Sequence, residues 1–381
     1  AAVMQREPPS PRYVGSQACI ACHRAESEAW QGSQHAKAMQ HATEAAVLGR
    51  FDGRQLRYNG VTSTFFQRDG KFFVNTDGPD GQLQDYEIKY TFGVEPLQQY
   101  LVEFPDGRMQ ALSLAWDSRA QAQGGQRWFH LYPGEHVDHR DPLHWTRLNQ
   151  NWNYMCADCH STNLRRNFDV AQNRYATTWS ELNVACEACH GPASGHVDWA
   201  ARASGGAQVT GTKGLVVAMD ERRGVSWRVS EATGNALRSA PMTSHREVET
   251  CATCHARRRP WTDGPGQSGH LLDNHDPALL TSGLYFADGQ QQDEVYTYGS
   301  FVQSRMYAHG VTCSDCHEPH AAKLRAPGNG VCAQCHLPAK YDAPAHTLHG
   351  AGSTGALHPA AHAVTATDNA TVAYTALGLG F

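Results

Sequence analysis

The sequence lacks the features that would place this protein in a membrane or hold it together by disulfides. No apolar run approaches the length of a transmembrane helix, so we expect a protein that does not span a membrane. No cysteine lies outside one repeated motif, which leaves none for a disulfide framework. A signal peptide is also absent, and the opening Ala1-Ala2-Val3-Met4 is typical of an end left by cleavage of such a signal.

The motif that the sequence does contain is Cys-x-x-Cys-His, present six times and using all 12 cysteines. Its two thiols add to the two vinyl groups of one porphyrin and its histidine binds the iron, so this spacing attaches a c-type haem. A zinc site has no need for histidine after every second cysteine, and a thioredoxin-like pair explains one motif but not six. We therefore predict six covalently bound haems c. The cysteines, in chain order as motifs 1 to 6, are Cys19 and Cys22, Cys156 and Cys159, Cys186 and Cys189, Cys251 and Cys254, Cys313 and Cys316, and Cys332 and Cys335. The iron-binding histidines are His23, His160, His190, His255, His317 and His336.

The balance of charge argues against nucleic acid as a partner. The formal net charge is −5, and each haem adds two propionates that this count omits. Arginines are clustered at 165–166, 222–223 and 257–259. We expect these clusters to pair with propionates or to lie on the solvated surface.

The motifs are unevenly spaced along the 381 residues, and this spacing divides the chain. We predict a segment with haem 1 at 1–50, a β-rich segment without haem at 51–135, and haems 2 and 3 at 136–200. An insertion at 201–245, haems 4 to 6 at 246–350 and a C-terminal tail at 351–381 follow.

Strand character is concentrated between motifs 1 and 2. Apolar runs flank Asp69-Gly70, a dipeptide typical of a hairpin turn, and a similar pattern surrounds Asp106-Gly107. Hydrophobic residues make up only 40% of the chain, so we expect porphyrins to supply much of its core. The predicted fold is a mainly α and irregular multihaem cytochrome c with a small antiparallel β-module.

Five stretches of the sequence are distinctive: Tyr13–Cys19, Ser33–Met39, Asn151–Cys156, Cys189–Pro192 and Gly310–His320. Together they resemble the cytochrome c554-like multihaem family, in particular the branch often fused to tetratricopeptide repeats. The likeness covers nearly all of 13–355 and implies a predominantly bis-histidine electron carrier. Relatives commonly continue with another haem motif and helical repeats, whereas here a Thr/Ala/Gly-rich tail follows Leu357-His358-Pro359. The resemblance therefore implies a six-haem relative without the repeats.

Six of the 22 histidines lie in the motifs, which leaves 16 others for at most six distal iron positions. The seven methionines are a poor alternative, because none lies in an obvious ligand loop, so bis-imidazole ligation is favoured. Position and the family likeness select His35, His130, His144, His196, His320, His346 and His349, with His245, His275 and His309 in reserve. Each could instead be a surface histidine or a hydrogen-bond partner of a propionate.

The favoured function is conduction of electrons along closely packed haems. All six motifs have the standard histidine, and no separate catalytic constellation is present. One alternative is an oxidoreductase with one open haem that acts on a small nitrogen or sulfur compound. The expected partners are redox proteins or further copies of the chain. Because haem c is attached outside the cytoplasmic membrane, we expect an exported protein, periplasmic or extracellular.

A conductive filament is a further possibility, with a discrete periplasmic carrier as its alternative. The segment Val372–Leu377 has strand-forming residues and no proline, so it could add to the edge of a neighbouring sheet. Histidines near the C-terminus could bind a haem of the next copy. A head-to-tail contact of this kind does not close on itself and would propagate.

Overall fold

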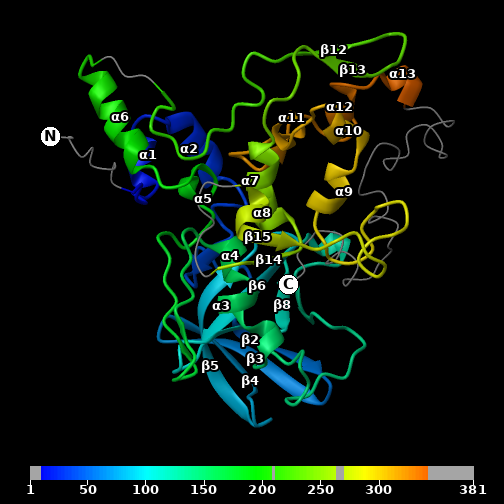
Figure 1. The fold of residues 1–381 in the computed structure, drawn as a ribbon. Coiled ribbons are helices and arrows are strands. Elements are labelled where there is room, and N and C mark those ends of the chain that lie inside the picture. The colour runs from blue at the N-terminus through cyan, green and yellow to red at the C-terminus, as the bar shows by residue number, and fades with distance from the viewer. Residues whose placement is uncertain (1–9, 208–210, 263–269, 342–381) are drawn as a thin grey trace.

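The computed structural model describes residues 10–207, 211–262 and 270–341. Figure 1 shows that this part of the chain has two regions. A large antiparallel sheet, drawn in blue and cyan, lies on one side, and short helices separated by long connections lie on the other.

The sheet contains nine strands, of which seven follow the order β2-β3-β4-β5-β6-β8-β9, while β1 pairs with β5 and β7 pairs with β6. The strands β2 and β9 at its two ends contact each other, so the sheet is nearly closed on itself. The nine strands are β1 (Met39–His41), β2 (Asp52–Tyr58), β3 (Val61–Arg68), β4 (Lys71–Asp77), β5 (Leu83–Phe92), β6 (Leu97–Glu103), β7 (Met109–Ala111), β8 (Leu114–Asp117) and β9 (Arg127–His130).

The two hairpins expected from the sequence are confirmed. Asp69 and Gly70 both have positive φ, 52° and 71°, and they join β3 to β4 directly beyond the Arg68–Lys71 pair. This backbone matches the right-handed twist of the flanking strands, and glycine adopts it without steric cost. Gly107, with φ 78°, lies in the turn between β6 and β7.

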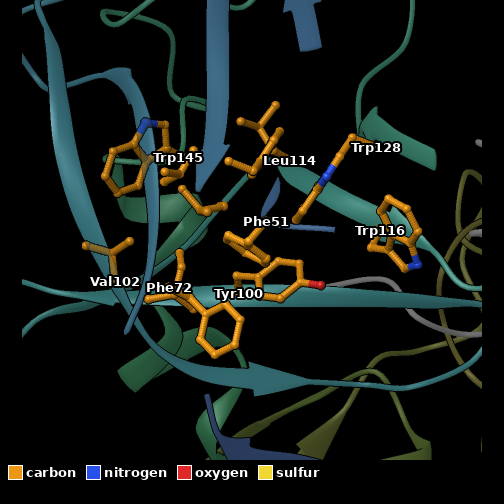
Figure 2. Packing of buried hydrophobic residues seen from close by; sticks show 12 residues of the cluster. Phe51, Phe72, Tyr100, Val102, Leu114, Trp116, Trp128 and Trp145 are labelled. Atoms are coloured by element: carbon orange, nitrogen blue, oxygen red, sulfur yellow. The ribbon is translucent and has the colours of Figure 1, made fainter. Parts of the chain in front are cut away.

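The sheet has its own aromatic core. Figure 2 shows Phe51 among Phe72, Tyr100 and Trp128, and each of these three rings meets it edge-on. The Phe65 ring stacks on Trp128 with the ring centres 3.5 Å apart. Buried aromatic side chains stabilise a fold through their large apolar area, so this region has a hydrophobic core that needs no porphyrin.

The second region is built from short elements. Its helices are α1 (Gln17–Ile20), α2 (Arg24–Gln31), α3 (Trp152–Met155), α4 (Ala157–His160), α5 (Cys186–His190), α6 (Ser194–Ser204), α7 (Arg246–His255), α8 (Leu271–Asn274), α9 (Tyr298–Val302), α10 (Arg305–Ala308), α11 (Cys313–Cys316), α12 (Gly330–Ala333) and α13 (Pro338–Tyr341). Two-stranded ladders pair β10 (Phe168–Asp169) with β11 (Arg174–Tyr175), β12 (Trp227–Val229) with β13 (Ala236–Arg238), β14 (Arg258–Pro260) with β15 (His275–Pro277), and β16 (His317–Glu318) with β17 (Lys323–Leu324). Single 3₁₀ turns occupy Gln121–Gln123 and Leu148–Gln150.

The expectation of a mainly α fold with a small β-module was wrong. The structure is 24% helix and 25% strand, and the large antiparallel sheet dominates it. The expectation underestimated how many of the short apolar runs between motifs 1 and 2 pair with one another. It also overestimated the helices, because a Cys-x-x-Cys-His motif needs little more than one helical turn.

The two regions meet at motif 2. Trp152 and Ala157, which flank Cys156, are fully buried in one cluster with Met39 of β1 and Met109 of β7. The side-chain oxygen of Asn153 also accepts a hydrogen bond from the backbone N–H of Met109, at 2.7 Å. This packing seats the haem 2 motif directly on the sheet. Strand β1 belongs to the segment 1–50 of the proposed division yet pairs within the sheet, and that division stays a prediction.

Candidate haem sites

Each motif begins on or next to a short helix, and in motif 5 the histidine already belongs to strand β16. In motif 1 the N–H groups of Cys22 and His23 both donate to the carbonyl of Cys19, at 3.2 and 2.9 Å. In motif 6 Cys335 and His336 donate in the same way to Cys332, at 3.0 and 2.9 Å. Residues three apart on a helix share one face, so the two sulfurs of a motif can reach the same porphyrin edge. All 12 cysteines lie within the described residues, and none forms a disulfide.

Three motif histidines each face a second histidine from a distant part of the chain. The ring centres of His23 and His196 are 6.1 Å apart. Those of His255 and His35 are 6.3 Å apart, and those of His190 and His320 are 6.5 Å apart. The three distal partners are among the seven candidates selected from the sequence.

This separation fits an iron atom between the two rings. A metal–imidazole bond is about 2 Å long and the ring centre lies about 1 Å behind the nitrogen, so two imidazoles on opposite sides of one metal are centred roughly 6 Å apart. The three observed distances agree with this value. The residues therefore fit the bis-histidine haem that the motifs imply.

Hydrogen bonds at Nδ1 orient several of these rings. Nδ1 of His196 lies 2.9 Å from the carbonyl oxygen of Lys213, and Nδ1 of His320 lies 3.1 Å from Oε1 of Glu318. Among the motif histidines, Nδ1 of His160 is 2.8 Å from the carbonyl oxygen of Ala38. When Nδ1–H donates to an oxygen, the lone pair lies on Nε2, which is the arrangement that metal-binding histidines use.

Burial lowers the pKa of two of the motif histidines. It lowers the pKa of His255 to about 4, and the nearby His35 and His317 lower it further in the same direction. Burial also lowers the pKa of His190, with smaller contributions from His320, His23 and His196. A protonated imidazole has no lone pair for a metal, so a lowered pKa keeps the ligand available at neutral pH.

Cysteines of different motifs lie close to one another. The Cys19 thiol of motif 1 lies near enough to Cys186 of motif 3 for that residue to raise its pKa, and Sγ of Cys159 in motif 2 lies 3.9 Å from the carbonyl oxygen of Cys254 in motif 4. In the same way, Cys313 of motif 5 raises the pKa of Cys251 in motif 4.

Two further approaches complete this network. Burial raises the pKa of Cys189 in motif 3, and the nearby Cys254 of motif 4 raises it further. Burial likewise raises the pKa of Cys316 in motif 5, and among the smaller causes are Cys332 and Cys335 of motif 6. The motifs are thus connected in the order 1-3-4-5-6, and motif 2 adjoins motif 4.

Two other candidates lie inside the sheet region, away from the motifs. His144 is buried, with Nδ1 2.8 Å from the hydroxyl of Thr146 and Nε2 3.1 Å from Oδ2 of Asp77. His130 stacks on Tyr58 with ring centres 4.0 Å apart, and its Nδ1 accepts a hydrogen bond from the N–H of Tyr132. A neutral His130 therefore carries its proton on Nε2, and its lone pair on Nδ1 is taken up by the N–H of Tyr132. Both nitrogens of His144 are engaged by hydrogen bonds. Neither ring offers a lone pair to a metal in this arrangement.

The last two candidates, His346 and His349, lie outside the described residues. Nothing in the sequence indicated which two histidines would lie opposite each other, because the members of each pair come from remote segments. The closest clue was position, since His196 and His320 follow motifs 3 and 5 by a few residues.

The clustered arginines contact protein carboxylates. Arg222 lies 3.0 Å from Asp315 within motif 5, and Arg258 lies 2.8 Å from Asp158 within motif 2. On either side of Arg258, Arg257 pairs with Asp293 and Arg259 with Asp276. Two of these ion pairs tie a haem motif to another segment, and pairing of the arginine clusters with propionates stays a prediction.

Two protein-family models match parts of the chain that contain haem motifs. The family model described as Cytochrome c554 and c-prime matches residues 18–53 and 125–191, which hold motifs 1 to 3 and His35. The model described as Doubled CXXCH motif matches residues 306–341, which hold motifs 5 and 6 and His320. The segment between the two c554 matches corresponds to most of the sheet.

Two solved structures are similar to the chain. One is the Outer Cell Wall Cytochrome OcwA, with 17% identity over 86% of this chain and 68% of that chain and a TM-score of 0.50. The other is the undecaheme cytochrome from the S-layer of Carboxydothermus ferrireducens, with 18% identity, 98% and 49% coverage and a TM-score of 0.40. The chain spans about half the length of this second protein. No curated protein matches the chain.

Among the described residues, no helix has the length and apolar character needed to cross a membrane. The resemblance stated from the sequence is confirmed by both family models, and the chain is a multihaem c-type cytochrome similar to the cytochrome c554 family.

Proposed function

We propose that the protein conducts electrons along six haems c, one on each motif. The observation that carries this proposal is the close approach of different motifs: Sγ of Cys159 in motif 2 lies 3.9 Å from the carbonyl oxygen of Cys254 in motif 4, and the thiols of Cys19 and Cys186 and of Cys251 and Cys313 lie near enough to shift each other's pKa. Each thiol is the attachment point of a porphyrin edge, so motifs whose thiols lie close together hold porphyrins close together. The rate of electron tunnelling falls steeply with distance, and such contacts keep each step short.

The order of the motifs in space supports a path across the molecule. Figure 1 shows α1 and α5 on one side, α4 and α7 in the middle, and α11 and α12 on the other side. These elements contain or border motifs 1 and 3, 2 and 4, and 5 and 6 respectively. The proposed path runs from motif 1 through 3, 4 and 5 to motif 6, with motif 2 as a branch at motif 4.

The three facing histidine pairs supply the proposed iron ligands. His196 completes the site of His23, His35 completes that of His255, and His320 completes that of His190. Haem c contributes an iron that changes by one electron between Fe³⁺ and Fe²⁺. Two imidazole ligands favour a low potential and leave no open position for a substrate. We leave His130 and His144 out of this ligand set.

The test is a count of haems combined with their spin state. Mass spectrometry of the denatured holoprotein should find six covalent haems and no free thiol. Low-temperature electron paramagnetic resonance of the oxidised protein should show low-spin signals for the haems on motifs 1, 3 and 4. High-spin iron at any of these three would refute the assigned ligands, and fewer than six haems would refute the proposed path.

A second candidate function, chemistry at an open haem, is favoured by the surroundings of motif 2. Within the described ranges, His160 has the ring of Phe92 against it, 5.5 Å between centres, and no second imidazole. Burial raises the pKa of Tyr132 and of Tyr296, and the nearby Cys156 adds to both shifts. Binding of carbon monoxide to the reduced protein, in a ratio of one per chain, would support an oxidoreductase, whereas no binding would support pure conduction.

We propose further that the protein is exported, because haem c is attached outside the cytoplasmic membrane. The protein also polymerises into a filament in this proposal, with redox proteins or copies of itself as partners. The C-terminal tail that would join the copies, residues 365–381, lies outside the described residues. Deleting residues 365–381 should abolish filaments seen by electron microscopy. A deletion variant with the assembly state of the full chain would leave a discrete carrier.

A further inference from the structure

A buried cluster of three charges lies where motifs 2 and 4 meet. Arg258, at the start of β14, and Arg166 both approach Oδ2 of Asp158, at 2.8 and 3.7 Å. Their side chains are only 8% and 7% exposed, and that of Asp158 is 15% exposed. Two guanidinium groups share one carboxylate, so these three groups together carry one net positive charge.

Packing holds Arg258 in place. Its Nε donates a hydrogen bond to the carbonyl oxygen of Thr253 within motif 4, at 2.7 Å, and its Nη2 lies 3.6 Å from Sγ of Cys159. Sγ of Cys159 in turn lies 3.9 Å from the backbone carbonyl oxygen of Cys254. The guanidinium group therefore sits against the attachment points of two haems, those on motifs 2 and 4.

This position differs from that of an arginine that binds a propionate. The propionates of a porphyrin lie at the edge opposite the two vinyl groups that receive the thiols. A guanidinium group beside Cys159 is thus remote from the propionates of haem 2, and its partner is the carboxylate of Asp158. Its charge is therefore not cancelled by the haem to which it is nearest.

A buried positive charge favours the reduced form of a nearby haem, because Fe²⁺ carries one positive charge fewer than Fe³⁺. Coulomb interactions are stronger in a protein interior than in water, and burial protects them from screening by salt. Net charge and burial are among the factors by which a protein sets the potential of a haem.

We infer that Arg258 and Asp158 tune the reduction potentials of the haems on motifs 2 and 4, with Arg258 raising them and Asp158 lowering them. This inference rests on the proposed function. Motif 4 is the motif whose cysteines lie close to cysteines of motifs 2, 3 and 5. If the haem on motif 4 has a raised reduction potential, an electron that arrives from the haem on motif 2, 3 or 5 stays longest on that haem.

The experiment compares charge changes at neighbouring positions in the intact holoprotein. Spectroelectrochemistry follows reduction while an electrode supplies one electron to each iron. Arg258→Gln should lower the midpoint potential of at least one haem by enough to change its ratio of reduced to oxidised form about tenfold at fixed potential, which is about 59 mV for one electron. Asp158→Asn should shift a midpoint in the opposite direction.

Two controls separate charge from packing. Arg258→Lys keeps the positive charge and should retain most of the original potential. Arg259→Gln removes an equal charge from the next residue, but the Arg259 side chain is 72% exposed and pairs with Asp276, so solvent screening should leave all midpoints unchanged. The number of covalent haems is counted for each variant.

The outcomes distinguish failure of this inference from failure of the proposed function. Unchanged midpoints in Arg258→Gln, or equal shifts in Arg258→Gln and Arg258→Lys, would overturn the inference while the conduction path stands. A wild-type protein without haem on motif 2 or 4 would overturn the path itself. If Arg258→Gln loses a haem, the direction of the shift in Asp158→Asn decides, and a downward or absent shift overturns the inference.

Discussion

The imidazole rings of His190 and His320 face each other with their centres 6.5 Å apart and their planes inclined by 15°. His190 belongs to motif 3, whereas His320 follows motif 5 by three residues. The other two pairs have the same character, because His196 follows motif 3 and faces motif 1, and His35 follows motif 1 and faces motif 4. Each proposed iron therefore links two segments of the chain, and loss of one ligand should affect both.

Removing a distal ligand should open one iron. His320→Ala leaves His190 as the sole protein ligand of its haem, so about one sixth of the iron should become high-spin and bind carbon monoxide when reduced. Electron paramagnetic resonance and carbon monoxide titration measure this change. His270→Ala is the matched control, since the His270 side chain is 73% exposed and bonds Glu249, and it should leave the spectrum unaltered. A wholly low-spin His320→Ala variant would show that the assignment is wrong.

Removing one thiol should leave a haem attached at one point. In Cys254→Ser the haem on motif 4 keeps only its bond to Cys251, and one vinyl group stays conjugated with the porphyrin. The α band of the reduced protein should therefore broaden toward longer wavelength, while the mass still corresponds to six haems. The wild-type protein is the control and should contain no reactive thiol after denaturation. Detection of two reactive thiols in the wild type would remove one haem from the count.

His144 should stabilise the sheet region without binding iron. His144→Ala removes the contacts with Thr146 and Asp77 and leaves Oδ2 of the partly buried Asp77 carboxylate without its imidazole partner. The free energy of unfolding should fall by about 1–3 kcal/mol, as is usual when a buried polar group loses its hydrogen bond. Thermal denaturation followed by the fluorescence of the tryptophans measures this loss. The number of low-spin haems should stay the same, and a new high-spin signal would return His144 to the ligand set.

The sheet region should lose stability in mild acid. Burial lowers the pKa of His130 to about 4, well below its usual value of 6.5, and the charge of Asp77 only partly opposes this. Between these two pH values the unfolded chain binds a proton that the folded protein does not, so this contribution is complete above pH 6.5 and is lost as the pH falls toward 4. The loss is about 3 kcal/mol at most.

The variant His130→Phe tests this assignment of the pH dependence. Its ring can still stack on Tyr58, but it binds no proton. Urea unfolding at several pH values should give a flatter dependence between pH 6.5 and 4 than in the wild type. Parallel curves for the two proteins would contradict the role of His130, whatever the difference in absolute stability.

Local patterns in the sequence predicted local structure well. The Asp69-Gly70 turn depends on residues that adopt positive φ, a preference set by neighbouring atoms alone. The overall fold class was wrong because strand pairing between distant runs, such as β1 with β5 and β6 with β8, leaves no local signal. The aromatic cluster around Phe51 shows its members only as scattered residues in the sequence.

The haem chemistry of this protein follows from its sequence by itself. Attachment requires two thiols and a histidine at fixed short spacing, and that geometry is built into one helical turn. The partners of these histidines were decided only by the tertiary structure, because an imidazole on the far side of an iron can come from any segment that folds to that place. We propose that His35, His196 and His320 reach such places, whereas His130 and His144 pack into the sheet, where Nδ1 of His130 accepts a hydrogen bond from Tyr132 and both nitrogens of His144 bond Thr146 and Asp77.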